Sequence, residues 1–97
     1  MLESGLEGSI RDYVRKCGGR AFKFVSPGTP GVPDRICVFP SARIIFVELK
    51  RPGVKDGRSI QQKKIGALLR RFGFEVWLIN NRQDFIDRLT ALGVVPL

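Results

Sequence analysis

Histidine is absent from this chain of 97 residues, and its absence removes several kinds of chemistry. Catalytic triads, acid–base pairs of the ribonuclease A type and histidine-bound metal centres all need an imidazole. With only two cysteines, the chain cannot build a zinc site either. The phosphoryl-transfer chemistry that remains is the kind in which carboxylates hold a metal ion.

Acidic residues are also scarce: nine Asp and Glu stand against seventeen Lys and Arg, so the formal net charge is +8. Such an excess in a small domain favours a polyanion as partner, because neutralised phosphates release counterions. A solvated basic surface is the alternative. The charge therefore predicts nucleic-acid binding, but it does not distinguish DNA from RNA, and alone it would fit a structural or toxin-like RNA-binding protein equally well.

Long apolar runs and a targeting segment are missing as well. No stretch approaches the length of a membrane span, and residues 1–5 contain no basic segment followed by an apolar core. We therefore expect a cytoplasmic protein without a signal peptide. Cys17 and Cys37 fit a reducing compartment, where both are expected to be small core residues and not a disulfide.

Helical and strand patterns alternate along the chain and predict one α/β domain over residues 1–97. Hydrophobic residues make up 43% of the chain, which is enough for a folded core. Periodicity predicts helices at about 6–17, 59–72 and 80–93, and strands at 22–25, 35–39, 44–50 and 74–79. The helical crossover between the last two strands implies that they pair in parallel. We expect a central mixed sheet flanked by helices.

The most informative residues are an aspartate and a Glu-x-Lys pair on neighbouring strands. Side chains alternate between the faces of a strand, so Glu48 and Lys50 project from the same side of an apolar run. The break at Pro40-Ser41 predicts a hairpin that folds Asp34 back beside residues 47–49. Two carboxylates and an ammonium group would then converge.

This combination suits phosphodiester chemistry. Asp34 and Glu48 supply the hard oxygen ligands that Mg²⁺ or Mn²⁺ prefers. Lys50 can orient an attacking water or pair with a phosphate oxygen, and we assign it electrostatic help before general-base work, because a lysine beside two carboxylates stays protonated unless it is buried. The alternative is a strand-end charge pair, with Asp34 as a turn residue after Pro33.

The segments Gly31-Val32-Pro33-Asp34 and Val47-Glu48-Leu49-Lys50 resemble the motifs of the PD-(D/E)xK nucleases, most closely those of the VRR-NUC (virus-type replication-repair nuclease) family. Members also carry a glutamate on the first helix and a glutamine at the start of the next helix. Here these would be Glu7 and either Gln62 or Gln61. The resemblance spans about residues 7–79.

The resemblance implies an αβββαβ core, here with an extra C-terminal helix, and a DNA endonuclease that uses Mg²⁺ or Mn²⁺. It implies catalytic roles for Asp34, Glu48, Lys50, Glu7 and Gln62, and a metal site formed by Asp34, Glu48, Glu7 and Leu49. Small viral or bacterial members act as homodimers on branched DNA, so four-way (Holliday) junctions become the expected substrate. Flaps or simple duplex DNA remain alternatives, as does a nuclease fold that binds DNA without cleaving it.

Structural roles compete for two of these residues. Ser4 and Glu7 have the spacing of a capping box, as do Ser59 and Gln62, and in both pairs the acidic or amide side chain would only satisfy the start of its own helix. Glu7 also lies on the flank of the helix's apolar stripe, from which it could face the metal. The sequence leaves both interpretations open.

Contacts with DNA can be placed loosely. The residues expected to bind phosphate are Lys23, Arg51, Lys55, Arg58, Lys63 and Lys64. Arg70 and Arg71 are more typical of charges that complement a helix end, and Trp77 is expected in the core. A dimer interface is expected either on the last helix with the tail 94–97 or on the first helix with Leu2 and Leu6, unless the tail packs on its own sheet.

Overall fold

The computed structural model describes residues 5–50 and 58–97, which form three helices and four strands. In chain order they are α1 (Gly5–Lys16), β1 (Arg20–Lys23), β2 (Arg35–Phe39), β3 (Arg43–Leu49), α2 (Ile60–Arg71), β4 (Glu75–Ile79) and α3 (Arg82–Ala91). This is the predicted αβββαβ order followed by a C-terminal helix. Within the described part of the chain, no helix is both long and apolar enough to cross a membrane.

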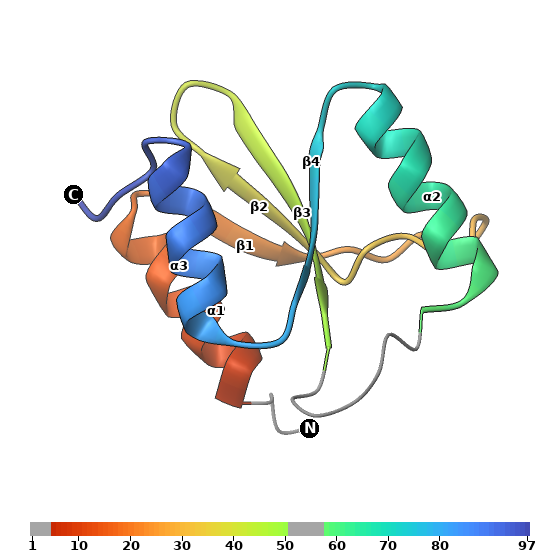
Figure 1. The fold of residues 1–97 in the computed structure, drawn as a ribbon, viewed down its shortest axis with the longest axis horizontal. Coiled ribbons are helices and arrows are strands. Elements are labelled where there is room, and N and C mark those ends of the chain that lie inside the picture. The colour runs from red at the N-terminus through yellow and green to blue at the C-terminus, as the bar shows by residue number, and fades with distance from the viewer. Residues whose placement is uncertain (1–4, 51–57) are drawn as a thin grey trace.

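The strands form one mixed sheet in the order β1-β2-β3-β4. The first three strands pair antiparallel, with Arg35 opposite Val47, while β3 and β4 run parallel, with Val47 opposite Trp77. Helix α2 makes the crossover that parallel pairing requires. Figure 1 shows α1 and α3 side by side and α2 apart from them, beyond β4. The predicted mixed sheet flanked by helices is confirmed.

The main core lies between the sheet and the pair α1 and α3. Val14 from α1, Phe85 and Leu89 from α3, and Ile45 and Val47 from β3 are all 0% exposed. Their alternation along β3 and their spacing along the helices follow directly from the two periodicities of the sequence. Burial of this many branched and aromatic side chains supplies most of the stability of a domain of this size.

Both cysteines belong to this core. Cys17 and Cys37 are buried free thiols, as predicted. Desolvation by burial raises the pKa of the Cys37 thiol to about 12, so it stays protonated and unreactive near neutral pH.

The first strand differs from its prediction. It covers Arg20–Lys23 and not residues 22–25. One further hydrogen bond, from the Phe24 N–H to the Asp34 carbonyl (2.9 Å), ends the pairing with β2. The chain then enters the loop that contains Pro27, Pro30 and Pro33, and proline cannot donate to a ladder.

The hairpin between β2 and β3 turns at residues 40–42, as predicted from Pro40-Ser41. Ser41 and Ala42 both adopt the left-handed region, with φ of 66° and 61°. Two successive positive φ angles match the right-handed twist of the strands but are unfavourable for residues other than glycine. The strand register that brings Asp34 to β3 is therefore set by a strained turn.

Candidate active site

Asp34 is fixed to the end of β3 by its side chain. Its Oδ2 accepts a hydrogen bond from the Leu49 N–H at 2.8 Å, and its carbonyl accepts from the Phe24 N–H at 2.9 Å. The aspartate precedes β2 directly, so these two bonds hold it between β1 and β3. The hairpin thus folds Asp34 back onto residues 47–49, as the sequence predicts, while the carboxylate remains exposed.

Glu48 lies beside it and is 4% exposed, the one buried charged residue in the ranges 5–50 and 58–97. Because Arg35 faces Val47 in the antiparallel register, Asp34 and Glu48 are the next pair along the two strands. A buried carboxylate is costly in free energy unless charges or hydrogen bonds compensate it. Its position in an otherwise apolar strand therefore indicates a function beyond packing.

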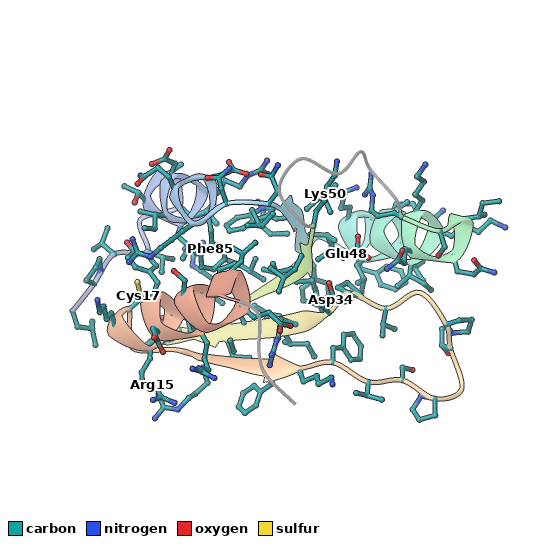
Figure 2. The ribbon with its side chains drawn as sticks, turned by 90° about the horizontal axis from the view of Figure 1, so that it is seen from below. Arg15, Cys17, Asp34, Glu48, Lys50 and Phe85 are labelled. Carbon is teal, nitrogen blue, oxygen red and sulfur yellow. The ribbon has the colours of Figure 1, made fainter. Side chains whose placement is uncertain are left out.

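Lys50 follows two residues later, where the strand ends. Its N–H donates to the Ile79 carbonyl at 2.8 Å, which extends the β3–β4 pairing by one bond. The alternation of side chains puts it on the same face as Glu48. Figure 2 shows the labelled side chains of Asp34, Glu48 and Lys50 near one another at this end of the sheet.

Leu49 contributes to the site through its backbone, since its side chain packs against the main core. Its N–H points to Asp34, and the N–H and C=O of one strand residue point to the same side. The Leu49 carbonyl is thus directed toward the side of the strand on which Asp34 lies. A main-chain oxygen is a ligand that a hard cation accepts.

Glu7 is held by a partner that the sequence analysis missed. The Arg35 Nη2 atom lies 3.4 Å from Glu7 Oε1, and the two side chains are 15% and 28% exposed. Arg35 immediately follows Asp34. A cation at the start of an apolar strand was the signal in the sequence that an acidic partner lies nearby. Among the described residues, no three acidic, cysteine or histidine side chains gather closely enough to hold a metal. The structure therefore pairs Glu7 with Arg35 and does not gather it with Asp34 and Glu48.

The capping alternatives for Glu7 and Gln62 have different outcomes. Gln62 Oε1 accepts from the Ser59 N–H at 2.8 Å, and Ser59 Oγ accepts from the Gln62 N–H at 3.1 Å, so the capping box is confirmed. For Glu7 the corresponding partner, Ser4, lies outside the described residues. A role for Gln62 in the reaction stays a prediction, and its amide is already engaged at the helix start.

The start of α2 is also packed against the loop that delivers Asp34. Gly31 has a φ of +95°, and a Cβ built on it would lie 2.6 Å from the Gln61 carbonyl oxygen. Only glycine fits both the backbone angle and this approach. The loop, the helix start and Asp34 thus form one tightly connected unit.

The predicted DNA-binding residues have mixed positions. Lys23, Lys63 and Lys64 are exposed and Arg58 is half-buried, whereas Arg51 and Lys55 lie outside the described residues. Arg70 donates from Nη2 to the Val76 carbonyl at 2.8 Å, which supports a structural role for it.

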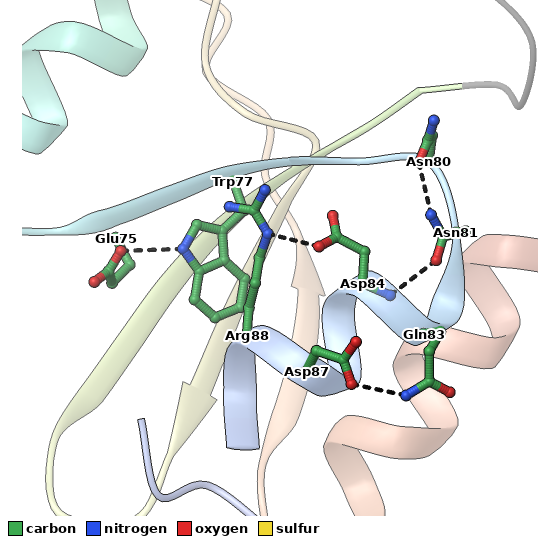
Figure 3. A network of polar contacts seen from close by, with 8 residues as sticks. All are labelled: Glu75, Trp77, Asn80, Asn81, Gln83, Asp84, Asp87 and Arg88. Atoms are coloured by element: carbon green, nitrogen blue, oxygen red, sulfur yellow. Dashed lines mark hydrogen bonds and ion pairs between the residues drawn. The ribbon is translucent and has the colours of Figure 1, made fainter. Parts of the chain in front are cut away.

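Trp77 is a core residue, as predicted. It is 5% exposed, and its indole N–H donates to Glu75 Oε2 at 3.0 Å. Figure 3 shows this bond together with Arg88, whose guanidinium lies 5.9 Å from the indole ring and pairs with Asp84. The polar network thus joins β4 to α3, and the indole is not a platform for a nucleobase.

Comparison with known proteins gives two informative matches. The chain is 55% identical over 91 residues to a protein of Acyrthosiphon pisum secondary endosymbiont phage 1 named "Putative nuclease p44", and the match covers 94% of this chain and 95% of that protein. A solved structure described as a VRR_NUC domain superposes with a TM-score of 0.76 at 23% identity, covering 89% of this chain and 90% of that one. The chain belongs to the same family as that phage protein and has the fold of a VRR_NUC domain. No protein-family model matches it.

The donor set of this chain is compatible with a hard divalent cation. Asp34 and Glu48 offer carboxylate oxygens, and Leu49 offers a main-chain carbonyl on the same side of β3. Mg²⁺ is usually held by one or two carboxylates and keeps several water ligands, so it needs no third acidic residue. Without histidine, and with both cysteines buried in the core, the chain offers little to softer metals.

Proposed function

We propose that this chain is a divalent-metal-dependent endonuclease that hydrolyses phosphodiester bonds in DNA. The observation that carries the proposal is the docking of the Asp34 carboxylate on the Leu49 N–H, next to the buried Glu48 and the strand-end Lys50. The phage relative named as a nuclease, 55% identical over nearly its whole length, supports the same chemistry.

In this proposal Asp34, Glu48 and the Leu49 carbonyl hold Mg²⁺ or Mn²⁺. The bound metal supplies an acidified water and neutralises charge on the phosphate. The chain itself orients Asp34 through the Leu49 N–H and keeps Glu48 out of bulk water, where its attraction to a cation is less screened. Lys50 places an ammonium on the same face, so that it can orient the attacking water or pair with a phosphate oxygen.

Glu7 and Gln62 are assigned positioning roles. Glu7 reaches the start of β2 through its ion pair with Arg35, directly after Asp34. Gln62 stands in the capping box at the start of α2, which is packed on the loop before Asp34. Both residues can therefore act on the position of Asp34 without binding the metal.

The proposed substrate is branched DNA, with four-way junctions first. A net charge of +8 favours phosphates, and the exposed Lys23, Lys63 and Lys64 are the described candidates for backbone contacts. A junction with two-fold symmetry needs nicks in two strands, which one small chain with one site cannot supply, so we propose a homodimer. Flap or duplex cleavage is the competing specificity.

The deciding experiment incubates the purified protein with linear, flapped and four-way DNA in Mg²⁺, Mn²⁺ or EDTA. We expect cleavage with either metal and none with EDTA, with paired nicks on the four-way junction. Binding of all three substrates without cleavage by either metal would instead indicate a DNA-binding module with a nuclease fold. Cleavage restricted to flaps or duplex would refute the junction specificity alone.

A further inference from the structure

The face of the sheet on which α2 lies carries a row of phenylalanines. Phe22 on β1 is opposite Ile36 on β2, which is opposite Phe46 on β3. The Phe46 ring lies 5.9 Å from the Phe24 ring and 5.4 Å from the Phe74 ring, measured between centroids. This phenylalanine row (Phe22, Phe24, Phe46 and Phe74) crosses the sheet from β1 to the start of β4.

Much of the phenylalanine row is open to solvent. Phe22 is 55% exposed and Phe74 is 38% exposed, and Phe72, at the end of α2, is 67% exposed. Helix α2 packs chiefly on β4, where Gly66 approaches Val76, so it leaves the β1 side of this face uncovered. Phe22 and Phe74 expose roughly 190 Å² of apolar area, taking about 200 Å² for a whole phenylalanine side chain, and Phe72, which stands outside the row, adds roughly 130 Å².

We propose that the phenylalanine row is the two-fold interface through which two copies of this chain associate. An interface of ordinary size buries about 800 Å² on each partner, of which a little over half, about 450 Å², is apolar. Phe22 and Phe74 supply about two-fifths of that area, and Phe72 at the end of α2 adds to it, as do the half-buried Ile36, Val38 and Ile44 on the same face of the sheet. This inference rests on the proposed function only for the expectation of a dimer.

Charge favours the same face. A chain with a net charge of +8 repels its own copy, so a self-contact must form where cations are few. By the alternation of side chains, the exposed cation among the described strand residues of this face is Arg20, at the edge of the sheet. Lys50 lies beyond Glu48, at the end of β3 away from Arg20.

The ring geometry fits protein packing better than base stacking. Phe46, at the centre of the row, is only 8% exposed, and Phe74 meets it edge-on at 88°. Interlocked rings of this kind are typical of cores and interfaces, whereas a stacking platform for single-stranded DNA presents open ring faces flanked by cations.

The two interfaces expected from the sequence are less suitable. The tail folds back on its own chain, where the Leu97 N–H donates to the Lys16 carbonyl at 3.0 Å and Val94 packs against the main core. Leu6 also packs against that core, and Leu2 lies outside the described residues. The structure thus holds the tail at α1 and at the main core, although Val95 and Leu97 remain exposed.

The test measures mass by light scattering and sedimentation equilibrium over a range of concentrations. We expect a dimer for the unaltered protein, a shift of at least tenfold toward monomer for Phe22→Lys, and recovery of the dimer with Phe22→Leu. Leu97→Lys is the matched control, because Leu97 is 96% exposed but lies outside the row. Thermal unfolding of each variant establishes that it is folded.

Each other outcome overturns the proposal in a recognisable way. A monomer at every concentration rejects the interface, and dissociation by Leu97→Lys with none by Phe22→Lys moves the interface to the tail. Loss of single-stranded oligonucleotide binding by Phe22→Lys without a change of mass makes the row a stacking platform. Cleavage is measured separately. A monomer that cleaves DNA refutes the interface but not the nuclease function. A dimer that does not cleave refutes the nuclease function but not the interface.

Discussion

The two faces of the sheet differ in what they bury. On the α1 and α3 side, Val14, Phe85 and Leu89 are fully buried and seal an apolar core. On the α2 side, the same sheet presents Glu48 and Lys50 at the end of β3 and the partly exposed Phe22 on the edge strand β1. Because side chains alternate along a strand, β3 supplies packing to one face and chemistry to the other, and a register shift of one residue would exchange them.

The largest expected effect is on the α2 side of the sheet, which carries Glu48 and Lys50 and is called the chemical face below. Glu48→Gln removes the charge of Glu48 while keeping its volume, so we expect cleavage to fall by about a thousandfold or more. Asp34→Asn and Lys50→Ala should each lose cleavage by orders of magnitude as well. Gel-based cleavage rates with Mg²⁺ and Mn²⁺ measure the effect, and DNA affinity measured by anisotropy should be retained.

Glu75→Gln is the matched control for this substitution. Glu75 is an exposed glutamate on β4 whose side chain accepts a bond from Trp77, and glutamine can accept it too. Cleavage by this variant should be normal. A Glu48→Gln protein that cleaves at the normal rate would exclude the proposed site.

The next prediction compares how much a substitution on each face of the sheet lowers the free energy of unfolding. Phe85→Ala empties a fully buried position between α3 and the sheet, so we expect the free energy of unfolding to drop by about 3–5 kcal/mol. Phe22→Ala, at a ring that is 55% exposed, should cost about 1 kcal/mol at concentrations where the protein is monomeric. Urea unfolding measures both, and equal losses would contradict the contrast between a sealed and an open face.

The chemical face was largely predictable from the sequence, because its parts are local. Asp34 reaches β3 through one short hairpin, and Glu48 and Lys50 share a face by alternation alone. The sequence offered only the cation at the start of β2 as a signal for the Arg35–Glu7 pair, since the pairing itself depends on how α1 is rotated against the sheet. The open phenylalanine row was missed for a similar reason: where α2 settles across the strands is decided by tertiary packing.

A smaller effect is expected at Glu7, which approaches the start of β2 from the α1 side. Glu7→Gln removes the charge that meets Arg35 at 3.4 Å, and we expect cleavage rate or metal affinity to fall more than tenfold with only a small shift in melting temperature. Isothermal titration with Mn²⁺ gives the metal affinity independently of turnover. Normal turnover and metal affinity with a lowered melting temperature would make the pair purely structural.

At Gln62 we expect the loss of stability to be more pronounced than the loss of turnover, the reverse of Glu7. The capping box contributes about 1 kcal/mol, so Gln62→Ala should lower the free energy of unfolding by that amount. Turnover should fall less than with Glu7→Gln, because the start of α2 still packs on Gly31. Unfolding and cleavage measured on one preparation decide it, and a tenfold loss of turnover at unchanged stability would assign Gln62 to the reaction.

The smallest effect is expected in the hairpin, which belongs to neither face but sets the register of both. Ala42 holds a φ of 61°, which glycine adopts without a Cβ clash, so Ala42→Gly should stabilise the protein by roughly 0.5–1 kcal/mol. Ala67→Gly is the control: this exposed alanine lies inside α2, where glycine should destabilise by a similar amount. Cleavage should be unchanged in both variants, because neither residue contacts Asp34 or Glu48. If Ala42→Gly instead slowed cleavage, the strained turn would be holding the register on which the chemical face depends.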